Sequence, residues 1–177
     1  MPDEFIQRFA QASDRLERIR QFWDKLLQEE TPDELTLEIG CGHGHWLTAY
    51  AERNPDKCCI GIDLITKRVD LAKRKKEKRK LPRARFFKAD AMEFLEGMSN
   101  NVKLARTILL FPDPWPKKRH HKRRLLNEAF LDLLATRTQM GGKMYFRTDH
   151  EEYFEWVVAK VASHGSWAAL PEEPWPF

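Results

Sequence analysis

The sequence predicts an α/β fold in which a doubly wound, mostly parallel sheet carries helices on both faces. From residue 35 onward, short apolar segments alternate with amphipathic or charged segments, as in successive βαβ units. Glycines follow the first apolar segment, and an acidic residue closes each of the next two. The 177 residues, of which 42% are hydrophobic, suffice for one domain with a buried core.

Local patterns define the elements in order along the chain. Apolar residues at steps of three and four predict an amphipathic N-terminal helix over residues 4–29, which ends before Thr31-Pro32-Asp33. We therefore divide a single domain, residues 1–177, into this helical segment (1–31) and a core (35–170). The strands expected in the core are 35–39, 58–62, 84–88, 105–110 and 143–147, with a sixth near 167–170. The further helices expected are 44–53, 66–80, 91–97, 122–138 and 150–163.

Composition argues against a membrane-spanning or secreted protein. No apolar run is as long as a transmembrane helix, and the first residues lack the apolar segment of a signal peptide. We expect a cytoplasmic protein without membrane contact, either a monomer or a homodimer. Cys41, Cys58 and Cys59 are odd in number and two are adjacent, which does not suit a disulfide framework. Cys41 with His43 and His45 lacks ordinary zinc spacing, so no metal is expected.

Basic residues are unevenly distributed, although the net charge is only +4. Residues 67–85 contain eleven lysines or arginines, and residues 117–124 contain six. Such clustering favours an acidic partner such as a nucleic acid. The alternative is that both clusters are solvated helix faces, and it applies more readily to 67–85 than to 117–124.

A glycine-rich turn follows the first predicted strand and opens the first core helix. Gly40, Gly42 and Gly44 permit a tight turn and let a ligand approach the backbone. Their G-x-G-x-G spacing differs from the G-x-G-x-x-G of dinucleotide-binding proteins, and Glu38 precedes them. A carboxylate there favours a ligand with an amino group or a cationic sulfur over a pyrophosphate.

Two more acids end the next two predicted strands. Asp63 is placed to accept hydrogen bonds from the ribose hydroxyls of an adenosine, and Asp90 from the adenine amino group. Together with Glu38 they form an acidic rim at the carboxyl ends of the strands. S-adenosylmethionine fits this rim better than NAD does, because it is positively charged and has no phosphate. The alternative for each acid is a loop or capping carboxylate.

The segment 111–124, Phe-Pro-Asp-Pro-Trp-Pro followed by a basic run, is the most informative in the chain. Pro112 and Pro114 restrain the backbone on both sides of Asp113. A fixed carboxylate beside a cationic run suits a site that binds a polyanion and presents one acid to one group on it. Trp115 either stacks on a base or packs in the core beneath the loop.

These motifs resemble those of the bacterial tRNA (guanine-N7-)-methyltransferases over roughly residues 35–160, and the segment 111–124 is the narrowest of them. The resemblance implies the class I methyltransferase fold, S-adenosylmethionine as cofactor and tRNA as partner. It also implies methyl transfer to N7 of a guanosine in the tRNA variable loop. The matching segments occur in the family's order: Glu38–Gly44, Gly61-Ile62-Asp63, Asp90-Ala91, Phe111–Arg124 and Thr148-Asp149-His150.

The resemblance also assigns roles to individual residues. Asp113 matches the family's catalytic aspartate, and Lys117 and Asp149 match substrate-binding residues. A helix cap is the competing role for Asp149, and Thr148 is another candidate for that cap. The cofactor is expected to contact Glu38, Gly40, Gly42, Gly44, Asp63, Asp90 and Ala91. The tRNA is expected to contact Trp115 by stacking and Lys118, Arg119, Lys122, Arg123 and Arg124 through phosphates.

The reaction needs alignment and charge stabilisation more than a base, because guanine N7 has an in-plane lone pair and no proton. As a carboxylate, Asp113 can accept hydrogen bonds from N1-H and N2-H of guanine and stabilise the cationic product. Two other functions stay open: methylation of an exocyclic amine in RNA or DNA, and RNA binding without catalysis. A dinucleotide oxidoreductase is disfavoured by the glycine spacing.

The sequence departs from the family at both ends. The family's Thr-x-x-Glu element, which reaches the target base, and its final strand are missing here. A basic N-terminal extension is also missing, because the first helix is mixed in charge. We expect the sequence to be cut short of the Thr-x-x-Glu element, with an incomplete C-terminal sheet edge.

Overall fold

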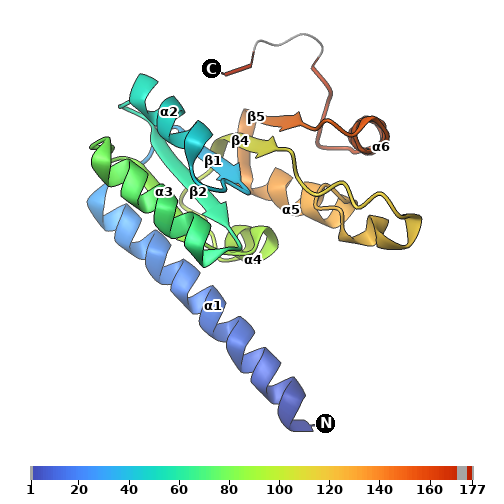
Figure 1. The fold of residues 1–177 in the computed structure, drawn as a ribbon, viewed down its shortest axis with the longest axis horizontal. Coiled ribbons are helices and arrows are strands. Elements are labelled where there is room, and N and C mark those ends of the chain that lie inside the picture. Colours follow the sequence, from blue (N-terminus) through green and yellow to red (C-terminus); the bar gives the residue numbers. More distant parts are fainter. Residues whose placement is uncertain (1, 171–174, 177) are drawn as a thin grey trace.

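A computed structural model describes residues 2–170, 175 and 176, without the side chains of Pro2, Asp3 and Phe5. Over this part of the chain, five parallel strands form one sheet in the order β3-β2-β1-β4-β5 (Figure 1). The chain winds outward in one direction from β1 to β3 and in the other from β4 to β5, which confirms the doubly wound α/β class. The strands are β1 (Leu35–Ile39), β2 (Cys58–Asp63), β3 (Ala84–Lys88), β4 (Leu104–Leu110) and β5 (Thr138–Arg147).

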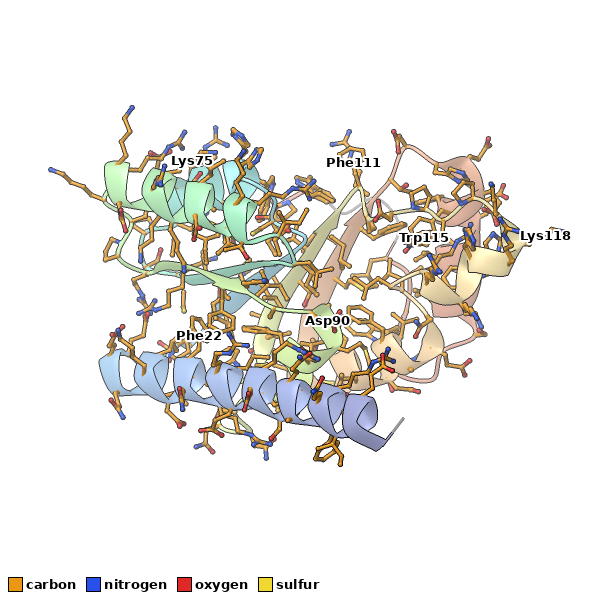
Figure 2. The ribbon with its side chains drawn as sticks, turned by 60° about the horizontal axis from the view of Figure 1, so that its bottom comes forward. Phe22, Lys75, Asp90, Phe111, Trp115 and Lys118 are labelled. Atoms are coloured by element: carbon orange, nitrogen blue, oxygen red, sulfur yellow. The ribbon has the colours of Figure 1, made fainter. Side chains whose placement is uncertain are left out.

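Helices cover both faces of the sheet. Figure 2 shows α1 on one side of it and α3 on the other. Helices α1, α4, α5 and α6 contribute to one apolar cluster with the strands, and α2 and α3 contribute to a second. The helices are α1 (Pro2–Glu29), α2 (His45–Arg53), α3 (Thr66–Lys78), α4 (Ala91–Glu96), α5 (Glu128–Arg137) and α6 (Glu151–Ala162), with a 3-10 helix η1 (Lys118–Arg123) before α5.

Helix α1 packs on the sheet only through its C-terminal half. Steps of three and four bring Ile19, Trp23 and Leu26 onto one face, where each side chain is 1% exposed. The ring of Trp23 lies 5.4 Å from the ring of Phe94 in α4. The N-terminal half of the helix extends past the rest of the molecule (Figure 1), and Phe9 on it is 71% exposed.

The helix expected over 122–138 is wrong at its start. Residues 118–123 form η1 instead, and α5 begins only at Glu128. Asn127 determines this boundary, because its side chain accepts a hydrogen bond from the Phe130 amide at 3.1 Å and so caps α5. The proline loop and η1 therefore form one irregular connection between β4 and α5.

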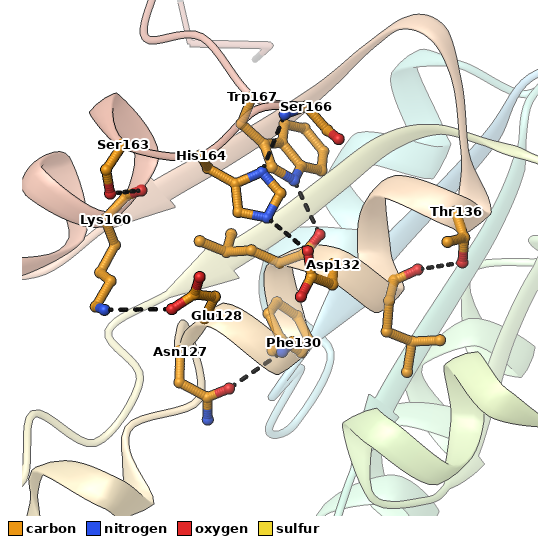
Figure 3. A network of polar contacts seen from close by, with 12 residues as sticks. Asn127, Glu128, Phe130, Asp132, Thr136, Lys160, Ser163, His164, Ser166 and Trp167 are labelled. Atoms are coloured by element: carbon orange, nitrogen blue, oxygen red, sulfur yellow. Dashed lines mark hydrogen bonds and ion pairs between the residues drawn. The ribbon is translucent and has the colours of Figure 1, made fainter.

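The expected sixth strand near 167–170 is not present, since these residues have no regular structure. One side chain of this segment and one just before it bind α5 instead (Figure 3). The indole of Trp167 donates to the Leu131 carbonyl at 3.0 Å, and the ring of His164 lies 3.1 Å from the Asp132 carboxylate. These contacts hold His164 and Trp167 against α5.

Candidate functional site

A cleft of about 410 Å³ opens at the carboxyl ends of the strands, where the winding direction changes between β1 and β4. This is where open α/β sheets bind ligands. The cleft brings together predicted site residues from four separate loops: Gly40, Asp63, Asp90, Ala91, Asp113, Trp115 and Arg123. The other predicted residues do not line it: Glu38, Gly42, Gly44, Lys117, Lys118, Arg119 and Asp149.

The three glycines of the first turn have positive φ angles but different surroundings. A side chain at Gly40 or Gly42 would meet nothing within 4 Å, so their backbone is open to a ligand. A Cβ at Gly44 would lie 2.8 Å from Ala72 and 2.9 Å from the ring of Phe86. Gly44 is therefore required for close packing of the turn against α3 and β3, whereas Gly40 and Gly42 leave room beside the cleft.

Glu38 lies below the turn and is 3% exposed. Burial raises the pKa of its carboxyl group to about 8, although the Leu47 amide bonds to it, and the nearby Asp63 carboxylate adds to the rise. Its Oε2 atom has no hydrogen-bond partner within the described residues. An unpaired buried carboxyl oxygen is costly unless a ligand satisfies it, and a cationic ligand would do so best.

Asp63 bonds to both the glycine turn and the turn that leads into α3, and it is 5% exposed. Its Oδ2 accepts from the Gly42 amide at 3.0 Å, and its Oδ1 accepts from the Ile65 amide at 2.8 Å. The guanidinium of Arg68 lies 3.7 Å from Oδ2. Asp63 therefore fixes the glycine turn against the start of α3 and also faces the cleft. Its carboxylate retains acceptor capacity for a ligand.

Asp90 caps helix α4, as the capping alternative predicted. Its Oδ1 accepts from the amides of Met92 at 2.8 Å and Glu93 at 3.2 Å. Both of these bonds use the same oxygen, and Asp90 still lines the cleft. The capping role fixes the carboxylate in place and does not conflict with ligand binding.

The proline loop after β4 is bent at two positions. Phe111 and Trp115 have φ angles of 50° and 45°, which are uncommon for residues other than glycine. The Phe111 amide continues the ladder to β5 by donating to the Arg147 carbonyl at 2.7 Å. Asp113 lies between the two bends, exposed to solvent and on the lining of the cleft.

Arg124 anchors this loop from beneath, and the sequence analysis placed it wrongly. The side chain is 0% exposed, so it cannot meet a phosphate on the surface. Its Nε donates to the Pro114 carbonyl at 2.8 Å, and its two terminal nitrogens bind the carboxylate of Glu152 in α6. The guanidinium also lies 4.9 Å from the ring centre of Tyr153 and 5.2 Å from that of Trp156.

No signal within the basic run distinguishes Arg124 from its neighbours. All members of that run are lysine, arginine or histidine. What separates Arg124 is its position directly after η1, where the chain turns back under the loop. The nearby aromatic and acidic residues that bury it come from α6, more than twenty residues later, and only the fold brings them together.

Trp115 lies at the rim of the cleft, so its alternative role as a core tryptophan is wrong. It is half-buried, and the Arg123 guanidinium lies 5.0 Å from the centre of its ring. The ring of His120 meets it edge-on at 5.8 Å. A tryptophan held in this way presents a flat apolar surface beside Asp113.

The remaining predicted substrate residues lie on exposed segments near the cleft. Lys117, Lys118 and Arg119 are exposed at the start of η1. Asp149 is exposed two residues beyond β5, on the same edge of the sheet. Neither Asp149 nor Thr148 caps α6; His150 does, because its Nδ1 accepts from the Tyr153 amide at 3.2 Å.

Within the described part of the chain, no group of three or more His, Cys, Asp or Glu residues is arranged to hold a metal ion. Cys41, Cys58 and Cys59 are all buried free thiols, and burial raises the pKa of each. None of the helices described here is both long and apolar enough to cross a bilayer.

Comparisons with known proteins identify the family of this chain. Residues 32–176 match the Methyltransf_4 family, whose description is "Putative methyltransferase". A tRNA (guanine-N(7)-)-methyltransferase of Magnetococcus marinus is 34% identical over 154 residues, which are 87% of this chain and 60% of that protein. Its counterpart in Treponema pallidum is 39% identical over 146 residues, 81% of this chain and 58% of that protein. The chain thus spans about 60% of the length of these relatives.

A solved structure confirms the fold at lower sequence similarity. The precorrin-6y C5,15-methyltransferase of Geobacter metallireducens superposes with a TM-score of 0.61 at 14% identity, over 87% of this chain and 69% of that one.

Proposed function

This chain belongs to the Methyltransf_4 family, and we propose that it transfers the methyl group of S-adenosylmethionine to N7 of a guanosine in tRNA. The observation that carries the proposal is the cleft, which places the Asp113 loop opposite the strand ends that carry Asp63 and Asp90. Relatives named tRNA (guanine-N(7)-)-methyltransferase support the choice of substrate.

The acidic rim fits the proposed cofactor. The unpaired Oε2 of Glu38 suits the positive charge of its amino-acid portion. Gly40 leaves backbone open to the ligand, and Asp63 and Asp90 are held by backbone amides where hydroxyl and amino groups can bind. The cofactor supplies a methyl group on a cationic sulfur.

Asp113 is the proposed catalytic residue. Transfer forms a bond between guanine N7 and the methyl carbon, while the carbon–sulfur bond breaks and its electron pair stays on sulfur. The positive charge moves onto the purine, and a carboxylate that accepts from N1-H and N2-H would stabilise it. No general base is needed, because N7 carries no proton.

The rim of the cleft supports the proposed contacts with tRNA. Trp115 offers a flat surface for base stacking, and Arg123 lies over its ring. Lys117, Lys118 and Arg119 are exposed cations beside it, and they would bind phosphates without reading sequence. Asp149 is the proposed further contact from the β5 side. We place this activity in the cytoplasm and treat residues 1–177 as one domain, whether as a monomer or a homodimer.

Transfer of radiolabelled methyl groups to unmodified bulk tRNA, followed by nuclease digestion and nucleoside identification, tests the proposal. We expect 7-methylguanosine as the labelled product. An N6-methyladenosine or N2-methylguanosine product would contradict the proposed acceptor atom. Binding of tRNA with no binding of S-adenosylhomocysteine would indicate an RNA-binding protein without catalysis.

A further inference from the structure

The basic segment 67–85 divides into cations that are bound within the fold and cations that are not. Arg79 binds Glu52 at 2.7 Å, Arg83 binds Glu30 at 2.6 Å, and Arg85 binds Glu29 at 3.0 Å. Lys75 donates to the carbonyl of His43 at 2.8 Å. These side chains hold α3 and β3 to their neighbours. They account for part of the charge that the sequence analysis attributed to an acidic partner.

Among the cations that the fold does not bind in this way, three are exposed and follow one face of α3. Lys67, Arg74 and Lys78 are spaced by seven and four residues, so they share one side of the helix. The buried residues Val69 and Ala72 lie on the opposite side, against the sheet. No ion pair joins these three cations to an acid among the described residues. We call Lys67, Arg74 and Lys78 the α3 stripe; it is about 16 Å long, from a rise of about 1.5 Å per residue.

The α3 stripe begins at the mouth of the cleft. Leu64, Ile65 and Arg68 line the cleft, and α3 starts at Thr66 between them. Figure 2 shows Lys75 of α3 on one side of Phe111 and Lys118 of η1 on the other. Two basic surfaces therefore flank the cleft. A ligand that contacts both surfaces must extend across the cleft.

The local field is consistent with a positive surface. The pKa of His45, at the start of α2, is lowered chiefly by the charge of Lys75, with smaller contributions from burial, His43 and Arg79. The local electrostatic potential is therefore positive, which disfavours protonation of His45 and favours binding of an anion. The α3 stripe adds further positive charge to α3, the helix that carries Lys75.

We propose that the α3 stripe binds phosphates of the tRNA backbone at a distance from the target guanosine, as a second contact surface beyond the cleft. This inference rests on the proposed function. The stripe contains no aromatic side chain, so it would contact phosphates rather than stack on bases. A membrane surface fits less well, because the apolar side of α3 is buried in the domain and not free to enter a bilayer.

The test compares tRNA binding by two triple variants across a series of salt concentrations. The first, K67Q/R74Q/K78Q, removes the α3 stripe. The matched control, R18Q/R20Q/K103Q, removes the same charge from exposed positions on α1 and before β4. We expect the first to weaken binding roughly tenfold near physiological salt and to flatten the slope of log K against log salt by about two. The control should change both much less.

Parallel titrations with S-adenosylhomocysteine separate the possible outcomes. Both variants should bind it as the wild type does, because none of the substituted residues lines the cleft. If the wild type binds tRNA and the two variants have equal slopes, the stripe is a solvated face and the inference is wrong. Stripe-dependent binding to anionic lipid vesicles with unchanged tRNA affinity would also overturn it. A wild type that binds no tRNA would contradict the proposed function itself.

Discussion

Individual residues in the cleft combine a structural bond with a free chemical group. Asp63 and Asp90 each accept amide hydrogen bonds within the fold and still face the cleft. Asp113 differs, because its position depends on the backbone around it rather than on a bond from its own side chain. Asp63 and Asp90, the proposed cofactor-binding acids, are thus held by hydrogen bonds to their own carboxylates, whereas Asp113, the proposed catalytic acid, is held by the backbone of its loop.

Replacing Asp113 by Asn should reduce methyl transfer by about a hundredfold or more while leaving cofactor affinity unchanged, because the amide keeps the shape but loses the negative charge. Single-turnover transfer to tRNA and calorimetry with S-adenosylhomocysteine measure the two effects. A variant that transfers methyl groups at the wild-type rate would remove Asp113 from the proposed role.

Cofactor binding should depend on pH through Glu38. Its pKa is raised to about 8 in the free protein, so the carboxyl group is mostly protonated at neutral pH. A cationic ligand prefers the carboxylate, so affinity for S-adenosylmethionine should rise as pH increases toward 8. We expect roughly a tenfold gain between about pH 6.5 and 8.5. Glu38→Gln should weaken binding and remove most of this dependence; an unchanged pH profile in that variant would contradict the assignment.

At the scale of elements, the glycine turn and the proline loop are stabilised by contacts from distant parts of the chain. The turn packs on α3 and β3 through Gly44, and the loop is anchored to α6 through Arg124. Each of the two loops is therefore held in one conformation by its contact with a packed helix. Substitutions at Gly44 and Arg124 therefore test how the two loops are held in place, because neither residue is proposed to contact the reacting atoms.

Gly44→Ala should destabilise the protein more than Gly42→Ala. Both glycines have positive φ, so both substitutions carry a similar backbone strain of about 1 kcal/mol. Only the Cβ at position 44 also meets neighbouring side chains, at 2.8 and 2.9 Å, which should cost roughly 1–3 kcal/mol more. Chemical denaturation measures the difference, and equal losses for the two variants would show that the turn relaxes around the added methyl group.

Arg124→Lys should slow catalysis without weakening cofactor binding. Lysine keeps the charge but cannot reach both the Pro114 carbonyl and the two oxygens of Glu152. We expect a loss of about 1–3 kcal/mol in stability and a lower kcat for tRNA. The neighbouring Arg123→Lys is the control for stability, since Arg123 is exposed. Wild-type kcat in a folded Arg124→Lys protein would show that the anchor does not position Asp113.

For the whole molecule, α1 is part of the domain through only half of its length. Its C-terminal half covers the sheet beside α4, whereas its N-terminal half extends beyond it (Figure 1). The layered arrangement also places two basic surfaces on opposite sides of one cleft. In both cases the fold brings together segments that are far apart in sequence.

Trp23→Ala should destabilise the entire domain by roughly 3–5 kcal/mol, because a fully buried aromatic side chain is lost from the sheet-facing side of α1. Phe9→Ala on the exposed half of the same helix should cost less than about 1 kcal/mol. Thermal unfolding followed by circular dichroism compares the two. A small effect of Trp23→Ala would mean that α1 folds apart from the core.

The sequence alone determined the α/β class, five of the strands and the edge of the sheet at which the acids meet. Buried parallel strands are short apolar runs, and the residue that ends each run necessarily lies at the carboxyl edge. Local patterns located the start of α5 only approximately. The residues of η1 and α5 are all compatible with a helix, and only the cap at Asn127 separates the two elements.

The tertiary structure decided which charges are available. In the sequence, Arg124 and Arg123 are equivalent neighbours, yet one is enclosed by α6 and the other lies over Trp115. Likewise, Arg79 is bound to Glu52 while Lys78 remains exposed. Whether a cation faces only water or binds a carboxylate depends on residues that only the folded chain brings near. Charge counts therefore indicated an acidic partner, but packing determined which side chains can reach it.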